Sequence, residues 1–264
     1  MKVYLAIDFG STYTKLTAID MDNEVILATA KDITTVENDI MIGFNKAFDK
    51  LKAAISEKVD FDSVEFVSKT ACSSAAGGLK MVAIGLVPEL TAEAAKKAAL
   101  GAGARVIKTY AYELNHRELE EIKATPLDII LLAGGTDGGN KDCIIHNAKM
   151  IAEYKLNVPV VVAGNKAAID EVEAIFKEAG IDHFITENVM PFINKLNVEP
   201  CREEIRKVFM GRIVEAKGMK NAEEFIKGIL MPTPAAVLKA AEVLAEGTDD
   251  EDGIGDLIVV DIGG

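Results

Sequence analysis

The apolar residues follow two different spacings, and the change between them divides the chain into an opening meander and a longer series of strand–helix units. Short apolar runs at residues 3–8, 14–20 and 25–30 are joined by only a few residues. Such short links predict antiparallel neighbours, because parallel strands need a longer crossover connection. Residues 36–57 then carry apolar positions at helical spacing, which predicts an amphipathic helix, and residues 64–68 form another candidate strand.

From about residue 81, candidate strands alternate regularly with candidate helices. The two later helices each carry a single apolar stripe, which is typical of a helix that covers one face of a parallel sheet. This alternation predicts a doubly wound α/β layer. The expected strands span residues 81–86, 105–110, 127–133, 158–163 and 183–186, and the expected helices span residues 92–102, 116–123, 140–154 and 166–179.

A third region begins with a helix over residues 205–213. Thr233 is then expected to cap a further helix, with Pro234 at its first position, where the missing N–H costs nothing. Gly247 ends that helix, and an acidic segment leads to a last expected strand over residues 257–261.

Composition narrows the classes of function. The 264 residues are 49% apolar and 27% charged, as in ordinary globular proteins, and 29 basic against 42 acidic residues give a formal charge of −13. This balance argues against nucleic-acid and anionic-membrane partners, which both need clustered basic residues. No apolar run approaches the ~20 residues that cross a bilayer. Three cysteines without a CxxC pair predict reduced thiols in a cytoplasmic protein.

Two segments share one arrangement of residues: an apolar run that closes on an aspartate, then one apolar residue, then glycine. Asp8 and Gly10 belong to the first segment, and Asp261, Gly263 and Gly264 belong to the second. An aspartate at a strand end can hold Mg²⁺ through water, because this ion keeps most of its hydration shell. Glycine lets backbone N–H groups approach phosphate oxygens closely.

The first segment continues with further groups suited to phosphate. Ser11, Thr12 and Thr14 add hydroxyl groups, and Lys15 adds a cation. A single Asp-X-Gly turn after a strand is common and is more often structural than functional. Two such turns, on strands that could face each other across a cleft, are much stronger support for a phosphate site.

A third motif, Met231-Pro232-Thr233-Pro234-Ala235-Ala236, opens the helix before the second segment. Together the three motifs resemble the actin-like ATPase superfamily, with its phosphate motifs D-x-G-S/T-x-x-x-K and D-x-G-G. The resemblance implies a ribonuclease H-like α/β lobe and ATP–Mg²⁺ in a cleft between lobes. It implies that Asp8 and Asp261 are catalytic residues that hold the hydrated metal, and that the cofactor-binding residues are Gly10, Ser11, Thr12, Thr14, Lys15, Gly263 and Gly264.

More narrowly, residues 7–15, 73–90, 129–140 and 230–247 resemble the family of glutamate mutase accessory proteins. This resemblance covers essentially the whole chain. It implies an ATP-dependent reactivating factor, or chaperone, whose partner is an adenosylcobalamin-dependent aminomutase such as glutamate mutase.

The expected domain organisation is an actin-like lobe at residues 1–80 and 230–264, with a Rossmann-like βα-repeat domain inserted at residues 81–229. Members of the family continue past the position of Gly264 through the rest of the second phosphate motif and an adenosine motif. The second motif here also lacks the return strand that residues 14–20 supply to the first. We therefore expect an N-terminal fragment, with ATPase activity only in the full-length protein.

A second glycine-rich segment, residues 133–140, joins an expected strand to an expected helix and contains Gly134, Gly135, Thr136 and Asp137. Two interpretations stay open: a structural β–α turn, or a ligand or partner site at the helix N-terminus. The aspartate argues against a bare phosphate there unless a metal intervenes. The segment looks like an adenosine motif, but it precedes the second phosphate motif, which reverses the order in the superfamily.

The middle region is also loosely similar to a cobalamin-binding Rossmann domain. The cobalt-ligating pattern D-x-H-x-x-G is absent, since neither His116 nor His183 lies in that context. We therefore expect no direct cobalamin ligation. Cys72 has no histidine nearby in the sequence, which favours a buried thiol over a nucleophile.

Two other functions stay open. A small-molecule kinase would share the cleft but needs an acceptor pocket and a catalytic base, and no base stands out in the sequence. A noncatalytic interaction module would have no nucleotide-dependent effect on a mutase.

Because the sequence lacks the adenosine motif of the family, we expect these 264 residues to bind ATP weakly or not at all. Isothermal titration calorimetry with Mg-ATP measures this affinity directly. A dissociation constant in the micromolar range would contradict the expectation.

Overall fold

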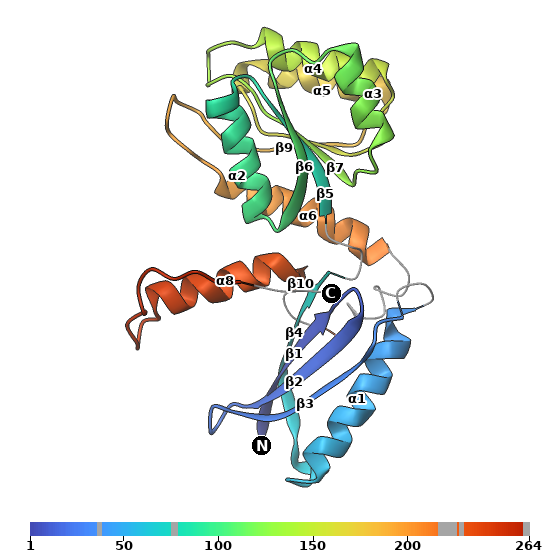
Figure 1. Cartoon of the computed structure of the whole chain (residues 1–264), viewed down its shortest axis with the longest axis vertical. Helices are drawn as coiled ribbons and strands as arrows, with labels where there is room; N and C mark the ends of the chain where they lie inside the picture. The colour runs from blue at the N-terminus through green and yellow to red at the C-terminus, as the bar shows by residue number, and fades with distance from the viewer. Residues whose placement is uncertain (36–38, 75–78, 216–225, 227–229, 261–264) are drawn as a thin grey trace. The chain divides into compact units, whose positions relative to one another are not determined.

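Figure 1 shows the computed structural model of the protein, which describes residues 1–35, 39–74, 79–215, 226 and 230–260. The chain divides into two compact units. The first unit consists of Met1–Gly78 together with Phe209–Gly264, and the second consists of Leu79–Val208. The sequence placed the second boundary at residue 230, whereas the structure joins Phe209 and the residues after it to the first unit.

The first unit is built on a mixed sheet of strands Lys2–Phe9 (β1), Tyr13–Asp20 (β2), Val25–Ile33 (β3), Glu65–Ser73 (β4) and Leu230–Pro232 (β10). Their order is β10-β4-β1-β2-β3. The first three strands form the antiparallel meander that the short links predicted, while β4 and β10 continue the sheet in parallel with β1. This order, in which β2 runs against the other described strands, is the ribonuclease H-like α/β arrangement expected from the sequence.

Helix α1 (Ile40–Ser56) covers one face of this sheet because its apolar residues recur at helical spacing. The Asp39 side chain caps the helix by accepting a hydrogen bond from the backbone N–H of Met41 at 2.8 Å. The buried Phe44 ring lies 6.0 Å from the ring of Phe9 on β1, centroid to centroid. The sequence predicted a start at residue 36, and residues 36–38 lie outside the described part. A short 3₁₀ turn, η1 (Phe61–Ser63), precedes β4.

Two lysines occupy backbone acceptors of the outer strand β3. Lys58 Nζ donates a hydrogen bond to the carbonyl oxygen of Leu27. Lys50 Nζ lies 3.5 Å from the carbonyl oxygen of Lys31 and 2.7 Å from the carboxylate of Asp32. Backbone acceptors on an outer strand are atoms that a further strand would otherwise use.

The second unit is built on a parallel sheet of strands Leu79–Gly85 (β5), Ala104–Ala111 (β6), Ile129–Leu132 (β7), Val160–Val162 (β8) and His183–Ile185 (β9). Their order is β6-β5-β7-β8-β9, and every neighbouring pair is parallel. The chain adds β6 on one side of β5 and then continues on the other side with β7, as in doubly wound folds. The predicted α/β layer is therefore confirmed.

Helices cover both faces of this sheet (Figure 1). A π-helical turn, η2 (Pro88–Ala92), leads into α2 (Glu93–Gly101), whose buried alanines pack against β5 and β6. Three helices cover the other face: α3 (His116–Ala124), α4 (Asp142–Glu153) and α5 (Ile169–Ala179). A 3₁₀ turn, η3 (Lys166–Ala168), precedes α5. Helix α6 (Glu199–Glu215) follows β9, and the division between the units falls within its sequence, after Val208.

Local signals set the ends of these helices. Asn115 begins α3 with a capping box, in which its side chain accepts from the N–H of Glu118 and the Glu118 side chain accepts in return. Gly180 ends α5 in the left-handed conformation, with φ of 67°. These helices lie within a few residues of their predicted positions.

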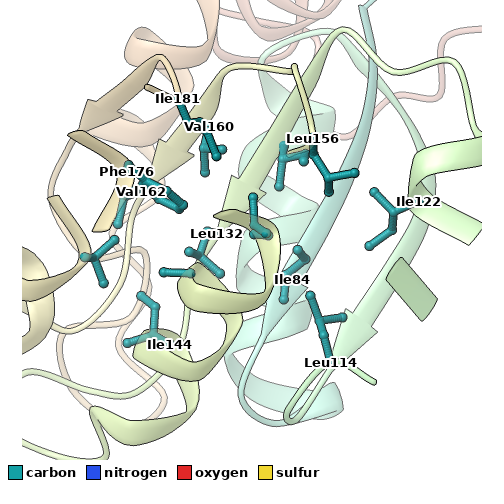
Figure 2. Close-up of a cluster of buried hydrophobic side chains, with 14 of the residues drawn as sticks. Ile84, Leu114, Ile122, Leu132, Ile144, Leu156, Val160, Val162, Phe176 and Ile181 are labelled. Atoms are coloured by element: carbon teal, nitrogen blue, oxygen red, sulfur yellow. The ribbon is translucent and has the colours of Figure 1, made fainter. Parts of the chain in front are cut away.

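Figure 2 shows the core between the second sheet and the helices α3, α4 and α5. Ile84, Leu132 and Val162 point into it from the strands, and Ile144 and Phe176 point into it from the helices. All four residues of β7 are fully buried, because both faces of the sheet are covered. This coverage explains why the parallel strands read as continuous apolar runs in the sequence.

Helix α8 (Thr233–Glu246) follows β10 directly, and its first residues correct one prediction. The helix begins with Pro232 at the N-cap position, and no side chain caps it. The Thr233 hydroxyl, predicted to cap the helix, donates instead to the carboxylate of Asp8 at 3.1 Å. The helix begins one residue earlier than predicted, so Thr233 is its first residue and not its N-cap, and the hydroxyl lies within reach of the carboxylate.

The strand predicted over residues 257–261 is wrong for the part that the structure describes. Residues 257–260 pair with none of the described strands. The side chains of Ile258 and Val260 are 92% and 76% exposed, so their apolar pattern does not reflect burial here. In the described part of the chain, no helix is long and apolar enough to span a membrane.

Replacing Phe176 by alanine tests the core in Figure 2. The Phe176 side chain is fully buried, so Phe176→Ala should lower the free energy of unfolding of the second unit by about 3–5 kcal/mol. Phe192, in the same unit, is 62% exposed, and Phe192→Ala should change stability by less than about 0.5 kcal/mol. Urea unfolding followed by circular dichroism measures both, and equal losses would contradict the assigned core.

Candidate functional site

Three parallel strands of the first unit end side by side. Asp8 on β1 is in register with Cys72 on β4, and Cys72 is in register with Met231 on β10. Helix α8 begins with Thr233, directly after β10. The carboxyl ends of parallel strands meet at one edge of a sheet, which is where doubly wound and related folds place ligands.

The Asp8 carboxylate lies at the centre of this edge. Its Oδ1 accepts hydrogen bonds from Thr233 Oγ1 at 3.1 Å and from Cys72 Sγ at 3.5 Å. Its Oδ2 lies 3.6 Å from Lys15 Nζ, and the side chain of Asp8 is 26% exposed. The carboxylate is therefore held on Oδ1 by two donors, and its Oδ2 faces the exposed side chain of Lys15. The sequence did not reveal either donor to Oδ1.

A tight turn connects Asp8 to β2. The N–H of Gly10 donates to the carbonyl oxygen of Tyr13 at 3.1 Å, and a Cβ on Gly10 would lie 2.6 Å from that same oxygen. Glycine is therefore required at this position for steric reasons. Ser11 and Thr12 lie exposed at the tip of the turn.

Thr14 differs from the other residues of the predicted phosphate motif. Its side chain is fully buried, and its hydroxyl hydrogen-bonds Thr34 Oγ1 at 3.0 Å. Thr14 lies on the same side of β2 as the buried Leu16 and Ala18, because alternate residues of a strand face the same side. Its hydroxyl stabilises the packing under the turn and is not presented to a ligand, which corrects the predicted role of Thr14.

A pocket of about 300 Å³ lies beside this edge, on the face of the sheet away from α1. Tyr4 and Ala6 of β1 line it from the sheet, and Ala236 and Lys239 line it from α8. The hydroxyl of Tyr4 hydrogen-bonds the hydroxyl of Thr70. The pocket also reaches Cys72 and so adjoins the surroundings of Asp8.

The Cys72 thiol is protonated at neutral pH. Burial raises its pKa to about 11, and the neighbouring Asp8 carboxylate acts in the same direction. The thiolate is the nucleophilic form of cysteine, so this environment suits a hydrogen-bond donor and not a nucleophile. The preference for a buried thiol is consistent with these surroundings.

Asp261, Gly263 and Gly264 of the second predicted phosphate motif lie outside the described residues. Within the described part of the chain, no group of three or more histidine, cysteine, aspartate or glutamate residues could hold a metal ion. Mg²⁺ bound mainly through water needs only one or two carboxylates, and Asp8 is a partly exposed carboxylate whose Oδ2 lies beside the exposed Lys15 side chain.

The glycine-rich loop of the second unit is held from inside by Asn165, which is fully buried. Its Oδ1 accepts from the N–H groups of Gly138 and Ala167 at 3.0 and 2.9 Å. Its Nδ2 donates to the carbonyl oxygens of Gly139 and Asn140 at 3.0 and 3.1 Å. Three of the four hydrogen-bonding positions of this side-chain amide therefore hold the loop, and the fourth caps the turn η3.

A second asparagine, Asn188, holds the other part of the loop. Its Nδ2 donates to the carbonyl oxygen of Gly135 at 3.0 Å and to Asp137 Oδ1 at 2.9 Å. Asp137 Oδ1 also accepts from the N–H of Lys166 at 3.1 Å. Gly134 and Gly135 have positive φ angles of 147° and 72°, which explains the glycines. Thr136 lies between them and Asp137, and these contacts account for the shape of the loop.

Two histidines of the second unit, His116 and His183, make hydrogen bonds within the fold. His116 Nδ1 lies 2.8 Å from the hydroxyl of Tyr154, and His183 Nδ1 lies 2.8 Å from the carbonyl oxygen of Ile181. Both positions are consistent with structural roles.

A protein-family model described as "MutL protein" matches residues 4–264 of the chain. The chain belongs to the MutL protein family. Protein MutL of Clostridium tetanomorphum is 72% identical over 264 residues, which are 100% of this chain and 56% of that protein. The chain therefore spans about half the length of this MutL relative.

Two solved structures are similar to the chain at low identity. The activator of the 2-hydroxyisocaproyl-CoA dehydratase from Clostridium difficile, with bound ADPNP, is 11% identical with a TM-score of 0.22, covering 80% of this chain and 97% of its own. The ethanolamine utilization protein EutJ from Carboxydothermus hydrogenoformans is 14% identical with a TM-score of 0.20, covering 76% and 88%. TM-scores this low do not establish a shared arrangement of elements.

The raised pKa of Cys72 predicts how its reactivity depends on pH. In a Cys143→Ala/Cys201→Ala variant, alkylation of Cys72 by iodoacetamide should accelerate about tenfold per pH unit up to about pH 10, because only the thiolate reacts. In the same variant unfolded in urea, the rate should be half-maximal near pH 8.5–9, the ordinary pKa range of a thiol. A half-maximal rate at that pH in the folded protein would contradict the assigned burial.

Proposed function

We propose that this chain is the nucleotide-responsive part of an ATP-dependent accessory protein that reactivates an adenosylcobalamin-dependent aminomutase such as glutamate mutase. Membership of the MutL family over nearly the whole chain supports the choice of partner, together with the resemblance to glutamate mutase accessory proteins. Three free cysteines fit a reducing compartment, and we propose that the protein works in the cytoplasm.

One observation carries the nucleotide part of the proposal: the turn after β1 and the start of α8 meet at the Asp8 carboxylate, although residues 8 and 233 are 225 positions apart. Asp8 and Thr233, which belong to two of the motifs found in the sequence, are therefore in direct contact. A phosphate site of the actin-like type requires these segments to lie together. Asp261, Gly263 and Gly264 complete the site in the proposal on the strength of the resemblance.

The described residues suggest a division of roles. Asp8 presents one carboxylate oxygen to the water shell of Mg²⁺, and the ion supplies neutralisation of phosphate charge. The exposed hydroxyls of Ser11 and Thr12 and the backbone of the Gly10 turn contact phosphate oxygens. Lys15, whose side chain is 62% exposed and beside Asp8, can turn toward the phosphates when they arrive.

Positioning and charge neutralisation are sufficient for phosphoryl transfer to water, since this chemistry needs little covalent help from the protein. In the proposal, turnover changes the arrangement of lobes around the nucleotide, and the bound mutase responds by releasing damaged cofactor. No cobalamin ligand is assigned to the chain.

Replacing Asp8 in the full-length protein tests the proposal. Asp8→Asn keeps the size of the side chain and removes its charge, so ATP-driven rescue of an inactivated aminomutase should fall at least about tenfold. Rescue is measured as recovered mutase activity with added adenosylcobalamin. Asp22→Asn, on the exposed turn after β2, is the matched control and should rescue like the unchanged protein.

The same assay separates the other functions. Equal rescue by both variants would remove the metal role of Asp8. Rescue that needs no nucleotide would favour an interaction module, and consumption of ATP that depends on a small-molecule acceptor would favour a kinase.

A further inference from the structure

The two oxygens of the Asp8 carboxylate have different surroundings. Thr233 Oγ1 donates to Oδ1 at 3.1 Å, and Cys72 Sγ approaches the same oxygen at 3.5 Å. Oδ2 has the Lys15 ammonium at 3.6 Å, on a side chain that is mostly exposed. One oxygen is thus tied to the protein interior, and the other faces a group that can move.

The elements that carry the two donors are fixed by the fold. Cys72 pairs with Asp8 across the parallel strands β1 and β4, and Pro232 pairs with Ser73 immediately before Thr233. Proline on each side of Thr233 restricts the backbone that places its hydroxyl. The hydroxyl of Thr233 donates to Asp8 Oδ1 and also contacts Cys72, and no side chain caps α8.

The two donors differ in strength. A hydroxyl donating to a carboxylate forms a charge-assisted hydrogen bond, whereas a thiol is a weak donor. Cys72 Sγ lies 3.5 Å from Asp8 Oδ1, against 3.1 Å for Thr233 Oγ1, so the thiol makes the weaker of the two contacts.

We infer that Thr233 is a positioning residue for Asp8, with Cys72 in a lesser role. By holding Oδ1, Thr233 fixes the rotamer of the carboxylate and leaves Oδ2 for the water shell of Mg²⁺ once Lys15 turns to phosphate. Partners that orient a metal-binding carboxylate commonly affect metal affinity by tenfold or more. The inference rests on the proposed function, since it takes Asp8 as the residue that orients the hydrated ion.

The test compares two substitutions of Thr233 in the full-length protein. Thr233→Val keeps the shape and loses the hydroxyl, whereas Thr233→Ser keeps the hydroxyl. Titration calorimetry measures ATP affinity with Mg²⁺ and with EDTA. Thr233→Val should reduce the gain in affinity from Mg²⁺ about tenfold, and Thr233→Ser should stay within about twofold of the unchanged protein. Affinity in EDTA should be the same for all three.

Two further variants sharpen the comparison. Thr29→Val makes the same substitution at an exposed position of β3 and should respond to Mg²⁺ like the unchanged protein. Cys72→Ala removes the weaker donor and should reduce the Mg²⁺ response only about twofold, because the Thr233 hydrogen bond remains.

Hydrogen–deuterium exchange without nucleotide supplies a second readout. The Thr233 hydrogen bond ties the first turn of α8 to β1, so Thr233→Val should speed exchange of the amides in that turn and Thr233→Ser should not. Faster exchange with an unchanged Mg²⁺ response would show a merely structural role and overturn the inference.

The outcomes separate the inference from the function on which it rests. If ATP affinity of the unchanged protein does not respond to Mg²⁺, the proposed function fails and the inference fails with it. If the unchanged protein responds and Thr233→Val responds equally, the inference alone fails.

Discussion

The parallel pairing of β10 with β4, and of β4 with β1, brings together residues from opposite ends of the chain. Strand β10 has only three residues, yet its register with β4 determines where α8 begins. Because parallel strands end at the same edge, the helix that leaves β10 must start beside the carboxylate that ends β1. The contact between Thr233 and Asp8 is therefore a consequence of sheet topology more than of local sequence.

This strand pairing brings together the two segments of the first unit, which the whole second unit separates along the chain. The second unit has a complete core of its own, in which every pair of neighbouring strands is parallel and both faces of the sheet carry helices. A unit that buries its own apolar surface can be inserted without disturbing the sheet of the first. The short strand β10 then joins the first sheet at its edge, beside β4.

Sequence periodicity predicted most of the fold because burial sets the period. The antiparallel meander, α1 and the alternating strands and helices of the second unit all carry apolar positions that the structure buries. The same reasoning failed at residues 257–260, where the apolar run meets no other described strand. A run of apolar residues shows that a segment can be buried, but it does not show which other segment would cover it.

The residues around Asp8 show where sequence reasoning reached its limit. These residues are of types that can bind phosphate. A hydroxyl can donate to any acceptor within reach, however, and the sequence does not show which acceptor lies near it in the fold. Thr233 was assigned to a helix end and contacts Asp8 instead. Thr14 was assigned to phosphate, although its alternation with the buried Leu16 already placed it under the turn.

The glycine-rich loop of the second unit shows the converse case. Its glycines were visible in the sequence, and the structure explains two of them by positive φ angles. The asparagines that hold the loop, Asn165 and Asn188, were not singled out, because each follows a different strand and only the parallel sheet brings them together. Buried amides with several partners are a stronger sign of a built loop than glycine content.

The lysines that contact β3 have a consequence for self-association. The ammonium groups of Lys50 and Lys58 already occupy carbonyl oxygens of this outer strand. A second molecule that extended the sheet would have to displace both ammonium groups and break the ion pair of Lys50 with Asp32. The fold thus discourages the growth of fibrils from this strand, even though β3 is rich in valine, isoleucine and alanine.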